Sequence, residues 1–163
     1  MQPSLTISRR VLLGALATTP LFTVSSASAI APLPRITVTK DPSCGCCGAW
    51  VDHVRAAGFP VEVIESPAVN RLKIRLGVPQ DLASCHTAEV GGYVIEGHVP
   101  ADAIKRLLAE KPQAKGLAVA GMPIGSPGME VAGVENDAYD IMLFGPAGQK
   151  TFARYNGPQI LRR

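Results

Sequence analysis

The chain has 163 residues, of which 47% are hydrophobic and 18% charged, and its formal net charge is +3. This length is enough for one domain with a real core. Neither a basic stripe nor a series of stacking aromatic residues is present, so nucleic acid is not an expected partner. The most informative feature is a group of three cysteines within four residues, Cys44-Gly45-Cys46-Cys47, with a single further cysteine at Cys85.

The N-terminus has the features of an export signal. The pair Arg9-Arg10 stands directly before an apolar run, Val11–Val24, that is too short and too interrupted for a membrane span. Ala27-Ser28-Ala29 follows as a small-residue cleavage motif. We predict a cleaved signal peptide over residues 1–29, of the twin-arginine type, although an ordinary secretory signal also begins with positive charge. Residues 30–163 would then form a single domain in the bacterial periplasm, with no stable membrane association after cleavage.

Strands and helices are predicted to alternate through most of the mature chain. The first strand alternates apolar and polar residues, and the first helix carries Trp50 and Val54 on one face. The elements expected in chain order are a strand over Arg35–Thr39, a helix from about Cys46 to Ala57, a strand over Val61–Glu65, a helix from a Ser66-Pro67 cap to Gly77, a strand-like stretch over Ser84–Val99 with a turn at Gly91-Gly92, and a helix from Pro100.

The C-terminal part is predicted to be a loop followed by a hairpin. Residues 121–129 are rich in glycine and proline, and Tyr139–Phe144 and Thr151–Tyr155 form two apolar strands across a turn at residues 145–148. The order is therefore β-α-β-α-β-β-α with an added loop and hairpin. Alternation of strands and helices predicts an α/β layer rather than a helix bundle or a β-sandwich.

Cys44 and Cys47 have the C-x-x-C spacing of a redox dithiol, and they lie where the first strand gives way to the first helix. Unpaired backbone N–H groups and the positive end of the helix dipole stabilise a thiolate at such a position. No catalytic residue is assigned from the sequence. If the protein carries out redox chemistry, Cys44 and Cys47 are the residues expected to perform it.

Cys46 is the departure from a simple dithiol. A third thiol would compete for the mixed disulfide during exchange, whereas in a metal site it adds a soft ligand suited to Cu(I), Zn(II) or an iron–sulfur centre. Zinc sites more often use two separated C-x-x-C pairs, and the neighbouring Cys46 and Cys47 side chains diverge, which makes one closed tetrahedron awkward. Metal-free redox chemistry and two structural disulfides, which an oxidising compartment permits, stay open as alternatives.

Cys85 is predicted to fold back and complete the site with Cys44, Cys46 and Cys47, although a buried free cysteine can also be a small hydrophobic residue. His86 is a secondary ligand candidate, but the alternation of side chains along a strand favours its pointing away from Cys85.

The other histidines and two methionines carry weaker signals. His53 and His98 are expected to be surface or capping residues. Met122 and Met129 flank the glycine–proline loop and are secondary candidates, because a thioether suits Cu(I), while methionine is more often a core filler.

Three runs of the chain resemble the CopG-like copper-resistance family: K-D-P-S-C-G-C-C-G-A-W, S-C-H-T-A-E-V-G-G-Y-V-I-E-G-H-V-P and G-L-A-V-A-G-M-P-I-G-S-P-G-M-E. The resemblance extends from about Arg35 to Tyr155. It implies a thioredoxin-like fold, a periplasmic location and copper bound by Cys44, Cys46, Cys47 and Cys85. It also implies a role in copper tolerance, through interconversion of Cu(I) and Cu(II).

The expected function is therefore that of a periplasmic copper-binding protein that holds Cu(I) through clustered cysteine thiolates. The alternative is a thiol–disulfide oxidoreductase that uses Cys44 and Cys47. The expected partners are copper ions and a periplasmic copper donor or electron partner. Whether the protein is an enzyme is left open by the sequence.

Overall fold

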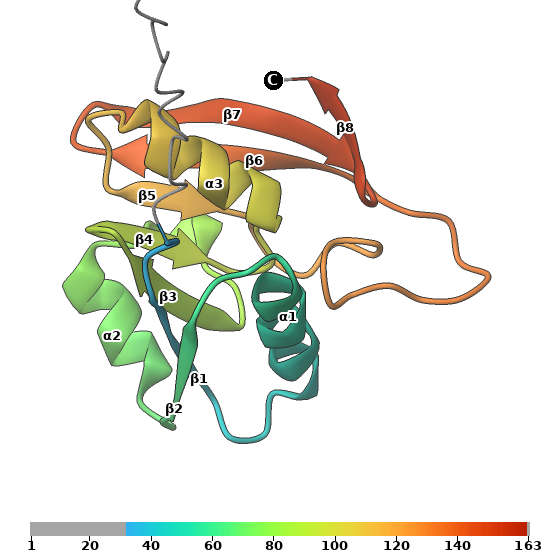
Figure 1. Ribbon diagram of the computed structural model, residues 1–163, viewed down its shortest axis with the longest axis horizontal. Helices are drawn as coiled ribbons and strands as arrows, with labels where there is room; N and C mark the ends of the chain where they lie inside the picture. The colour runs from blue at the N-terminus through green and yellow to red at the C-terminus, as the bar shows by residue number, and fades with distance from the viewer. Residues whose placement is uncertain (1–31, 163) are drawn as a thin grey trace, which may run out of the picture. The chain divides into compact units, whose positions relative to one another are not determined.

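The computed structural model describes residues 32–162, so the predicted signal peptide lies outside the described residues (Figure 1). Three α-helices, a short 3-10 helix and eight strands make up this part of the chain. In chain order they are β1 (Ile36–Lys40), α1 (Gly45–Ala56), β2 (Val61–Glu65), α2 (Val69–Leu76), η1 (Gln80–Leu82), β3 (His86–Val90), β4 (Tyr93–Glu96), α3 (Ala101–Glu110), β5 (Gly116–Ala118), β6 (Ala138–Gly145), β7 (Gly148–Asn156) and β8 (Gln159–Arg162).

The eight strands form one sheet in the order β2-β1-β3-β4-β5-β6-β7-β8. β1 pairs parallel with β2 and antiparallel with β3, where Val38 lies opposite Ala88. β4 is antiparallel to β3 and parallel to β5, and β6, β7 and β8 continue as an antiparallel meander. The mixed α/β class and the order β-α-β-α-β-β-α are therefore confirmed.

The two faces of the sheet carry separate apolar cores. Trp50 and Val54 of α1 and Ile104 and Leu107 of α3 belong to the larger core, together with Ile95 of β4. A smaller core contains Val94 of β4, Ala118 of β5 and Phe144 of β6, with Leu76 of α2 packed against it. Neighbouring residues of β4 thus point to opposite cores, as the period of a strand requires. α1 and α3 cover one face, and α2 covers the other.

Four details of the fold differ from the sequence prediction. α2 begins at Val69 rather than at the Ser66-Pro67 cap, because the Ser66 hydroxyl accepts the amide N–H of Ala68 at 3.1 Å in a turn that precedes the helix. β5 and β8 were not expected. β5 is only three residues long, too short for an alternation to be seen, yet it joins the predicted β6–β7 hairpin to the rest of the sheet. The hairpin strands are also longer than predicted.

The topology brings several strand ends together at one edge of the sheet. Because β3 is antiparallel to β1 and β4, the end of β1 lies beside the start of β3 and the end of β4, and β5 ends there as well. Gly97, just after β4, has φ +69°, and a Cβ there would lie 2.6 Å from both the Ser84 side chain and the Val119 carbonyl oxygen. Only glycine lets these three segments approach so closely.

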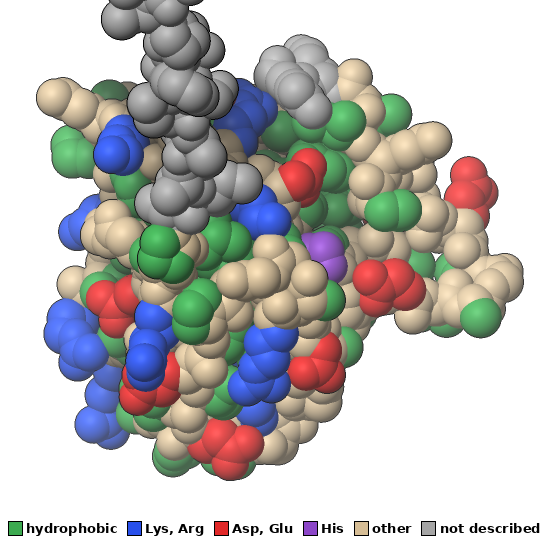
Figure 2. Space-filling view, in the orientation of Figure 1, with side chains coloured by type: hydrophobic (Ala, Val, Ile, Leu, Met, Phe, Trp, Pro, Cys, Tyr) green, Lys and Arg blue, Asp and Glu red, His purple; other side chains and the backbone are tan. Residues whose placement is uncertain are grey.

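None of the helices in residues 32–162 has the length and apolar composition needed to cross a membrane. On the face shown in Figure 2, basic and acidic side chains are interspersed over the lower half of the molecule rather than gathered by sign.

Candidate metal centre

The four cysteines come together at the edge of the sheet where β1 ends and β3 begins. Their sulfur atoms all lie within 4.8 Å of one another, and we call this group, Cys44, Cys46, Cys47 and Cys85, the thiol cluster. Cys47 is fully buried, whereas the other three are partly exposed. The thiol cluster is therefore an open-sided site with one sulfur in the core.

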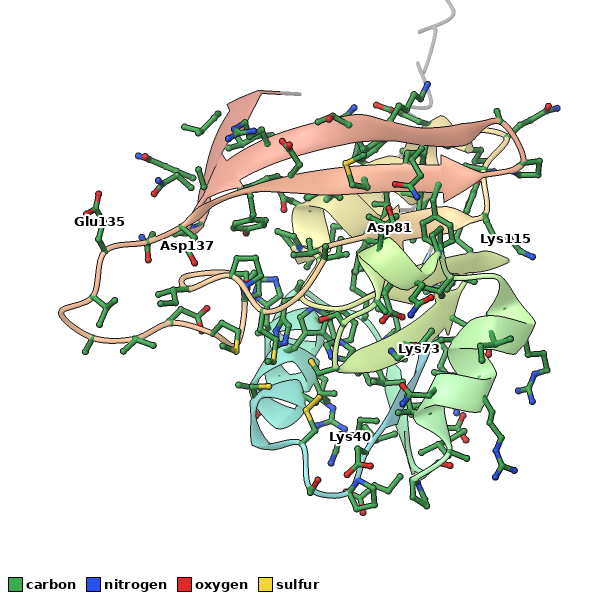
Figure 3. The ribbon with its side chains drawn as sticks, turned by 180° about the vertical axis from the view of Figure 1, so that it is seen from behind. Lys40, Lys73, Asp81, Lys115, Glu135 and Asp137 are labelled. Carbon is green, nitrogen blue, oxygen red and sulfur yellow. A yellow bond between two sulfur atoms is a disulfide. The ribbon has the colours of Figure 1, made fainter. Side chains whose placement is uncertain are left out.

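Cys44 and Cys47 form a disulfide with a Cα–Cα distance of 5.6 Å, while Cys46 and Cys85 are free thiols (Figure 3). The pairing is the one that the C-x-x-C spacing favours. Cys44 is the N-cap residue of α1, so the disulfide spans the first turn of the helix. The Cys46 sulfur lies outside this pair, 3.6 Å from the Cys44 sulfur.

A local turn places the first cysteine. The Asp41 carboxylate accepts the backbone N–H of Ser43 at 2.9 Å and the Ser43 hydroxyl at 2.5 Å, and these hydrogen bonds lower the pKa of Asp41. The Cys44 N–H donates to the Asp41 carbonyl at 3.0 Å. The chain thus turns sharply between β1 and α1 and presents the cysteines at the start of the helix, as the sequence predicted.

Cys85 directly precedes β3, and its side chain lies against the other three cysteines. Two histidine rings flank its sulfur. The distances from the Cys85 Sγ are 3.3 Å to His86 Nδ1 and 3.0 Å to His98 Nε2. These three residues form a second group whose ligand atoms lie within 4.8 Å of one another. Cys85 therefore belongs both to a set of four sulfurs and to a set with two nitrogens.

The hydrogen bonds of His98 fix its tautomer. Its Nδ1 lies 2.8 Å from the carbonyl oxygen of Pro127, which can only accept, so Nδ1 carries the proton. Burial lowers the pKa of His98 and keeps the ring neutral. Nε2 then presents a lone pair to the Cys85 thiol. A ring whose second nitrogen is held by a backbone carbonyl is the arrangement typical of a metal-binding histidine.

His86 is fully buried against the ring of Trp50, with the ring centroids 4.4 Å apart. Burial, and then the neighbouring His98 and Lys73, hold the pKa of His86 well below its usual range, so the ring is neutral. Its Nε2 has no hydrogen-bond partner among residues 32–162. A buried nitrogen without a partner is uncommon and costs stability, and it leaves His86 Nε2 free to take a ligand.

The Cys85–His86 dipeptide is held at both ends by one buried carboxylate. The Glu96 side chain accepts the backbone N–H of Ser84 at 2.7 Å and the hydroxyl of Thr87 at 2.7 Å. Lys73, which points from α2 towards β3 and β4 in Figure 3, neutralises Glu96 at 2.6 Å. This network fixes the backbone that carries two of the candidate ligands.

The loop after β5 closes the other side of the site. Gly128 has φ +85°, and a Cβ there would lie 2.7 Å from the Trp50 amide nitrogen and 3.1 Å from the Cys46 carbonyl oxygen. The loop therefore packs directly on the first turns of α1. It also supplies the Pro127 carbonyl to His98 and brings the Met122 Sδ to 3.9 Å from the Cys46 Sγ.

The positions of the secondary candidates correct several expectations. His86 does not point away from Cys85, because Cys85 precedes β3 and the alternation of a strand does not extend to it. His98 is not a surface or capping residue but is fully buried. His53 is a capping residue, since its Nε2 accepts the N–H of Ala101 at the start of α3. Within residues 32–162, the sulfurs of the thiol cluster form their hydrogen bonds with residues other than Met129.

Burial, and then the neighbouring Cys46, raise the pKa of the Cys85 thiol to about 11. Because the thiolate is the nucleophile, alkylation of Cys85 by iodoacetamide at pH 8 should be at least about tenfold slower than that of an ordinary free cysteine. The rate should keep rising with pH until about pH 11. Mass-spectrometric peptide mapping of the oxidised protein separates Cys85 from Cys46. A rate that levels off below pH 9 would instead mean that His98 removes the thiol proton.

Comparisons with known proteins agree with the geometry. Residues 82–129 match the family described as "Protein of unknown function, DUF411". No protein among the curated sequences matches the chain. Two solved structures are similar to it, both named as the copper resistance protein copG. Form 2 has 41% identity and a TM-score of 0.71, with 76% of this chain and 98% of that chain covered.

Form 1 of the same protein has 41% identity and a TM-score of 0.71, with 77% of this chain and 99% of that chain covered. This identity extends over nearly the full length of a protein named for copper resistance. The chain therefore belongs to the CopG copper-resistance family.

Proposed function

We propose that the protein binds copper as Cu(I) through the thiolates of Cys44, Cys46, Cys47 and Cys85. The observation that carries this proposal is the gathering of four sulfur atoms within 4.8 Å of one another. Thiolates are soft ligands that select Cu(I) over harder ions. The name of the similar proteins, copper resistance protein copG, supports copper as the metal.

Cu(I) binding by all four sulfurs requires the reduced protein. Reduction of the Cys44–Cys47 disulfide by a dithiol takes up two electrons and two protons and leaves four thiols. Each thiol that becomes a copper ligand then releases its proton, so copper binding competes with protonation and strengthens as the pH rises. The raised pKa of Cys85 makes this competition strong at the Cys85 thiol.

The two neutral histidines support a role in redox handling of copper as well as in its binding. Imidazole nitrogen suits both oxidation states, whereas thiolate favours Cu(I). Cys85 connects the sulfur-rich group to His86 and His98. A site of this composition is suited to interconvert Cu(I) and Cu(II) as part of copper resistance.

We place this function in the periplasm, after cleavage of a twin-arginine signal over residues 1–29. The export route carries folded proteins, which suits a protein with fragile thiols. The order β2-β1-β3-β4 and a C-x-x-C pair at the start of α1 support a thioredoxin-like description of residues 30–163.

Anaerobic titration of the reduced protein with Cu(I), in competition with a chromogenic Cu(I) chelator, tests the proposal. Cys46→Ser should weaken Cu(I) retention on the order of 100-fold or more, because even loss of a hydrogen-bond partner of a ligand costs about 10–100-fold. Ala49→Ser, one turn further along α1 and exposed, is the matched control and should retain copper like the wild type. Absence of retained copper, or a Cys46→Ser variant that behaves like the control, would exclude the proposed site.

A second candidate function is thiol–disulfide exchange, and the Cys44–Cys47 disulfide is the observation that favours it. In this function the disulfide oxidises a substrate dithiol, which gives up two electrons and two protons. Cys46→Ser should leave this activity intact or improve it, since Cys46 only competes for the mixed disulfide. Catalytic-rate oxidation of a dithiol peptide by Cys46→Ser, together with no Cu(I) binding by the wild type, would favour this function over the first.

A further inference from the structure

The edge strand β2 leaves one row of backbone groups without a partner. β2 is the first strand of the sheet, and within residues 32–162 it pairs only with β1 (Figure 1). Two hydrogen bonds flank this ladder: the Ile36 N–H donates to the Pro60 carbonyl at 2.8 Å, and the Ser66 N–H donates to the Lys40 carbonyl at 2.9 Å. The backbone groups of successive residues in a parallel strand point to alternate sides. The even-numbered residues of β2 therefore bond to β1, and Val63 directs its N–H and C=O outward.

The side chains at the centre of β2 do not protect this edge. Val63 and Ile64 are 36% and 44% exposed. Charged side chains and prolines usually prevent an edge strand from pairing with another chain. β2 contains no proline, and its two glutamates form ion pairs with Arg35 and Lys40, on the β1 side, at 3.4 and 3.0 Å. The edge is thus apolar at its centre and open to a further strand.

A groove of about 430 Å³ lies between β2 and α2, on the face of the sheet that α2 covers. Ile64 of β2 and Thr37 of β1 line it from the sheet, and Arg71 and Arg75 line it from α2. Neither arginine takes part in an ion pair within the described part of the chain. Guanidinium groups bind carboxylates through two parallel hydrogen bonds. The groove therefore offers two unpaired cations beside the open edge.

The negative charge of the groove lies away from the edge. Among the described residues that line the groove, only Glu89 is acidic. It belongs to β3, and the sheet order places β1 and β2 between it and the open edge. A strand added outside β2 would be three strand spacings, about 14 Å, from β3. Because this exceeds the Debye length at physiological salt, Glu89 repels a carboxylate on the added strand only weakly.

We propose that β2 and the groove beside it bind an extended acidic segment of another protein as an additional strand of the sheet. The backbone of the segment would pair with the outward N–H and C=O of Val63. Its alternate side chains would point to the α2 face, where carboxylates meet Arg71 and Arg75, and the others would pack on the Val63 side chain. The partner is thus expected to alternate acidic and apolar residues. None of the four cysteines lines the groove, so this inference does not depend on copper binding.

Titration of the ¹⁵N-labelled protein with a short peptide of alternating glutamate and valine, followed by amide NMR shifts, tests this inference. The shifts should concentrate in β2 and in the residues that line the groove, and a peptide of alternating lysine and valine should produce none. Arg71→Glu/Arg75→Glu should weaken peptide binding about tenfold or more, because two ion pairs are lost and repulsion replaces them. Arg55→Glu/Lys150→Glu changes the net charge equally at exposed positions outside the groove, and should bind the peptide like the wild type.

Val63→Pro tests the backbone pairing separately. Proline removes only an outward N–H at this position and is tolerated in an edge strand, so the ladder to β1 should persist while the peptide no longer binds. Unchanged amide resonances outside β2 show that the variant is folded. Peptide binding that neither Val63→Pro nor Arg71→Glu/Arg75→Glu weakens, or that the control variant weakens equally, would overturn the proposal. Concentration-dependent shifts of β2 without peptide, absent in Val63→Pro, would instead assign the edge to a second copy of this chain.

Discussion

Replacing Lys73 with methionine is expected to lower the free energy of unfolding by about 3–5 kcal/mol, the usual cost of removing one partner of a buried ion pair. The Lys73 and Glu96 side chains are 7% and 0% exposed, and their charged atoms are 2.6 Å apart. Methionine preserves most of the volume, so the variant removes the charge together with the hydrogen bond that the Lys73 ammonium donates to the Thr87 hydroxyl at 2.9 Å. Denaturant unfolding is followed by the fluorescence of Trp50, the single tryptophan of the chain.

Two further variants show whether burial of the pair is the cause. Arg154→Met removes a cation from a surface pair with Asp140 and should cost no more than about 1 kcal/mol. The double variant Lys73→Met/Glu96→Gln removes both charges, while the glutamine oxygen can still accept the Ser84 N–H. It should recover most of the stability lost in Lys73→Met. A double variant that is less stable than the single one would mean that the Glu96 carboxylate itself, rather than its pairing, stabilises the fold.

The Lys73–Glu96 ion pair could not be predicted from the sequence. Lys73 lies on α2, whose sequence shows a simple apolar stripe. A lysine on such a helix is expected to be exposed to solvent. Its partner is 23 residues away in the chain, and only the packing of α2 on β3 and β4 brings the two together. A buried ion pair of this kind leaves no periodic signal. Its position could be found only once the register of the β3–β4 pair was known.

His98 was missed for a related reason. Its position before α3 suggested a cap, because the sequence does not reveal how far the end of β4 lies from Cys85. The antiparallel β3–β4 pairing sets Thr87 opposite Glu96, and this register carries His98 to the Cys85 sulfur. The β3–β4 hairpin could have revealed the position of His98, because its turn at Gly91-Gly92 was predicted from the sequence. Extending the pairing outward from that turn puts Cys85 and His98 at the same end.

The features that were predicted correctly depend on local chemistry or strong periodicity. The C-x-x-C spacing and the turn before α1 lie within a few residues, and Trp50 and Val54 repeat at helical spacing. The folding back of Cys85 onto the cluster was also predicted, because the sequence predicted export and an unpaired thiol is unusual in an exported protein. What could not be anticipated is the close approach of three loops around it, which depends on the absence of a single Cβ at Gly97.

Gly97→Ala is expected to lower the free energy of unfolding for two reasons, backbone strain and steric overlap, both of which glycine avoids at this position. A positive φ costs an L-residue about 1–2 kcal/mol. The new Cβ would also lie 2.6 Å from the Val119 carbonyl oxygen and from the Ser84 Cβ, and overpacking of this kind adds about 1–3 kcal/mol. Gly92→Ala separates these costs, since Gly92 has φ +85° and nothing within 4 Å of its Cβ position. The free energy of unfolding should therefore fall further in Gly97→Ala than in Gly92→Ala.

The steric part of this effect should also reach the thiol cluster. Ser84 directly precedes Cys85, and its Cβ can move away from the new methyl group only if its backbone moves. This movement shifts Cys85 and lengthens the 3.0 Å contact between Cys85 Sγ and His98 Nε2. Gly97→Ala should accordingly bind Cu(I) more weakly than the wild type, while Gly92→Ala, at the far end of the hairpin, should bind it equally well. Chelator competition on both variants, under conditions where both are folded, measures the difference. Equal Cu(I) affinity in the two variants would show that the approach of residues 84, 97 and 119 serves the fold alone and not the placement of Cys85.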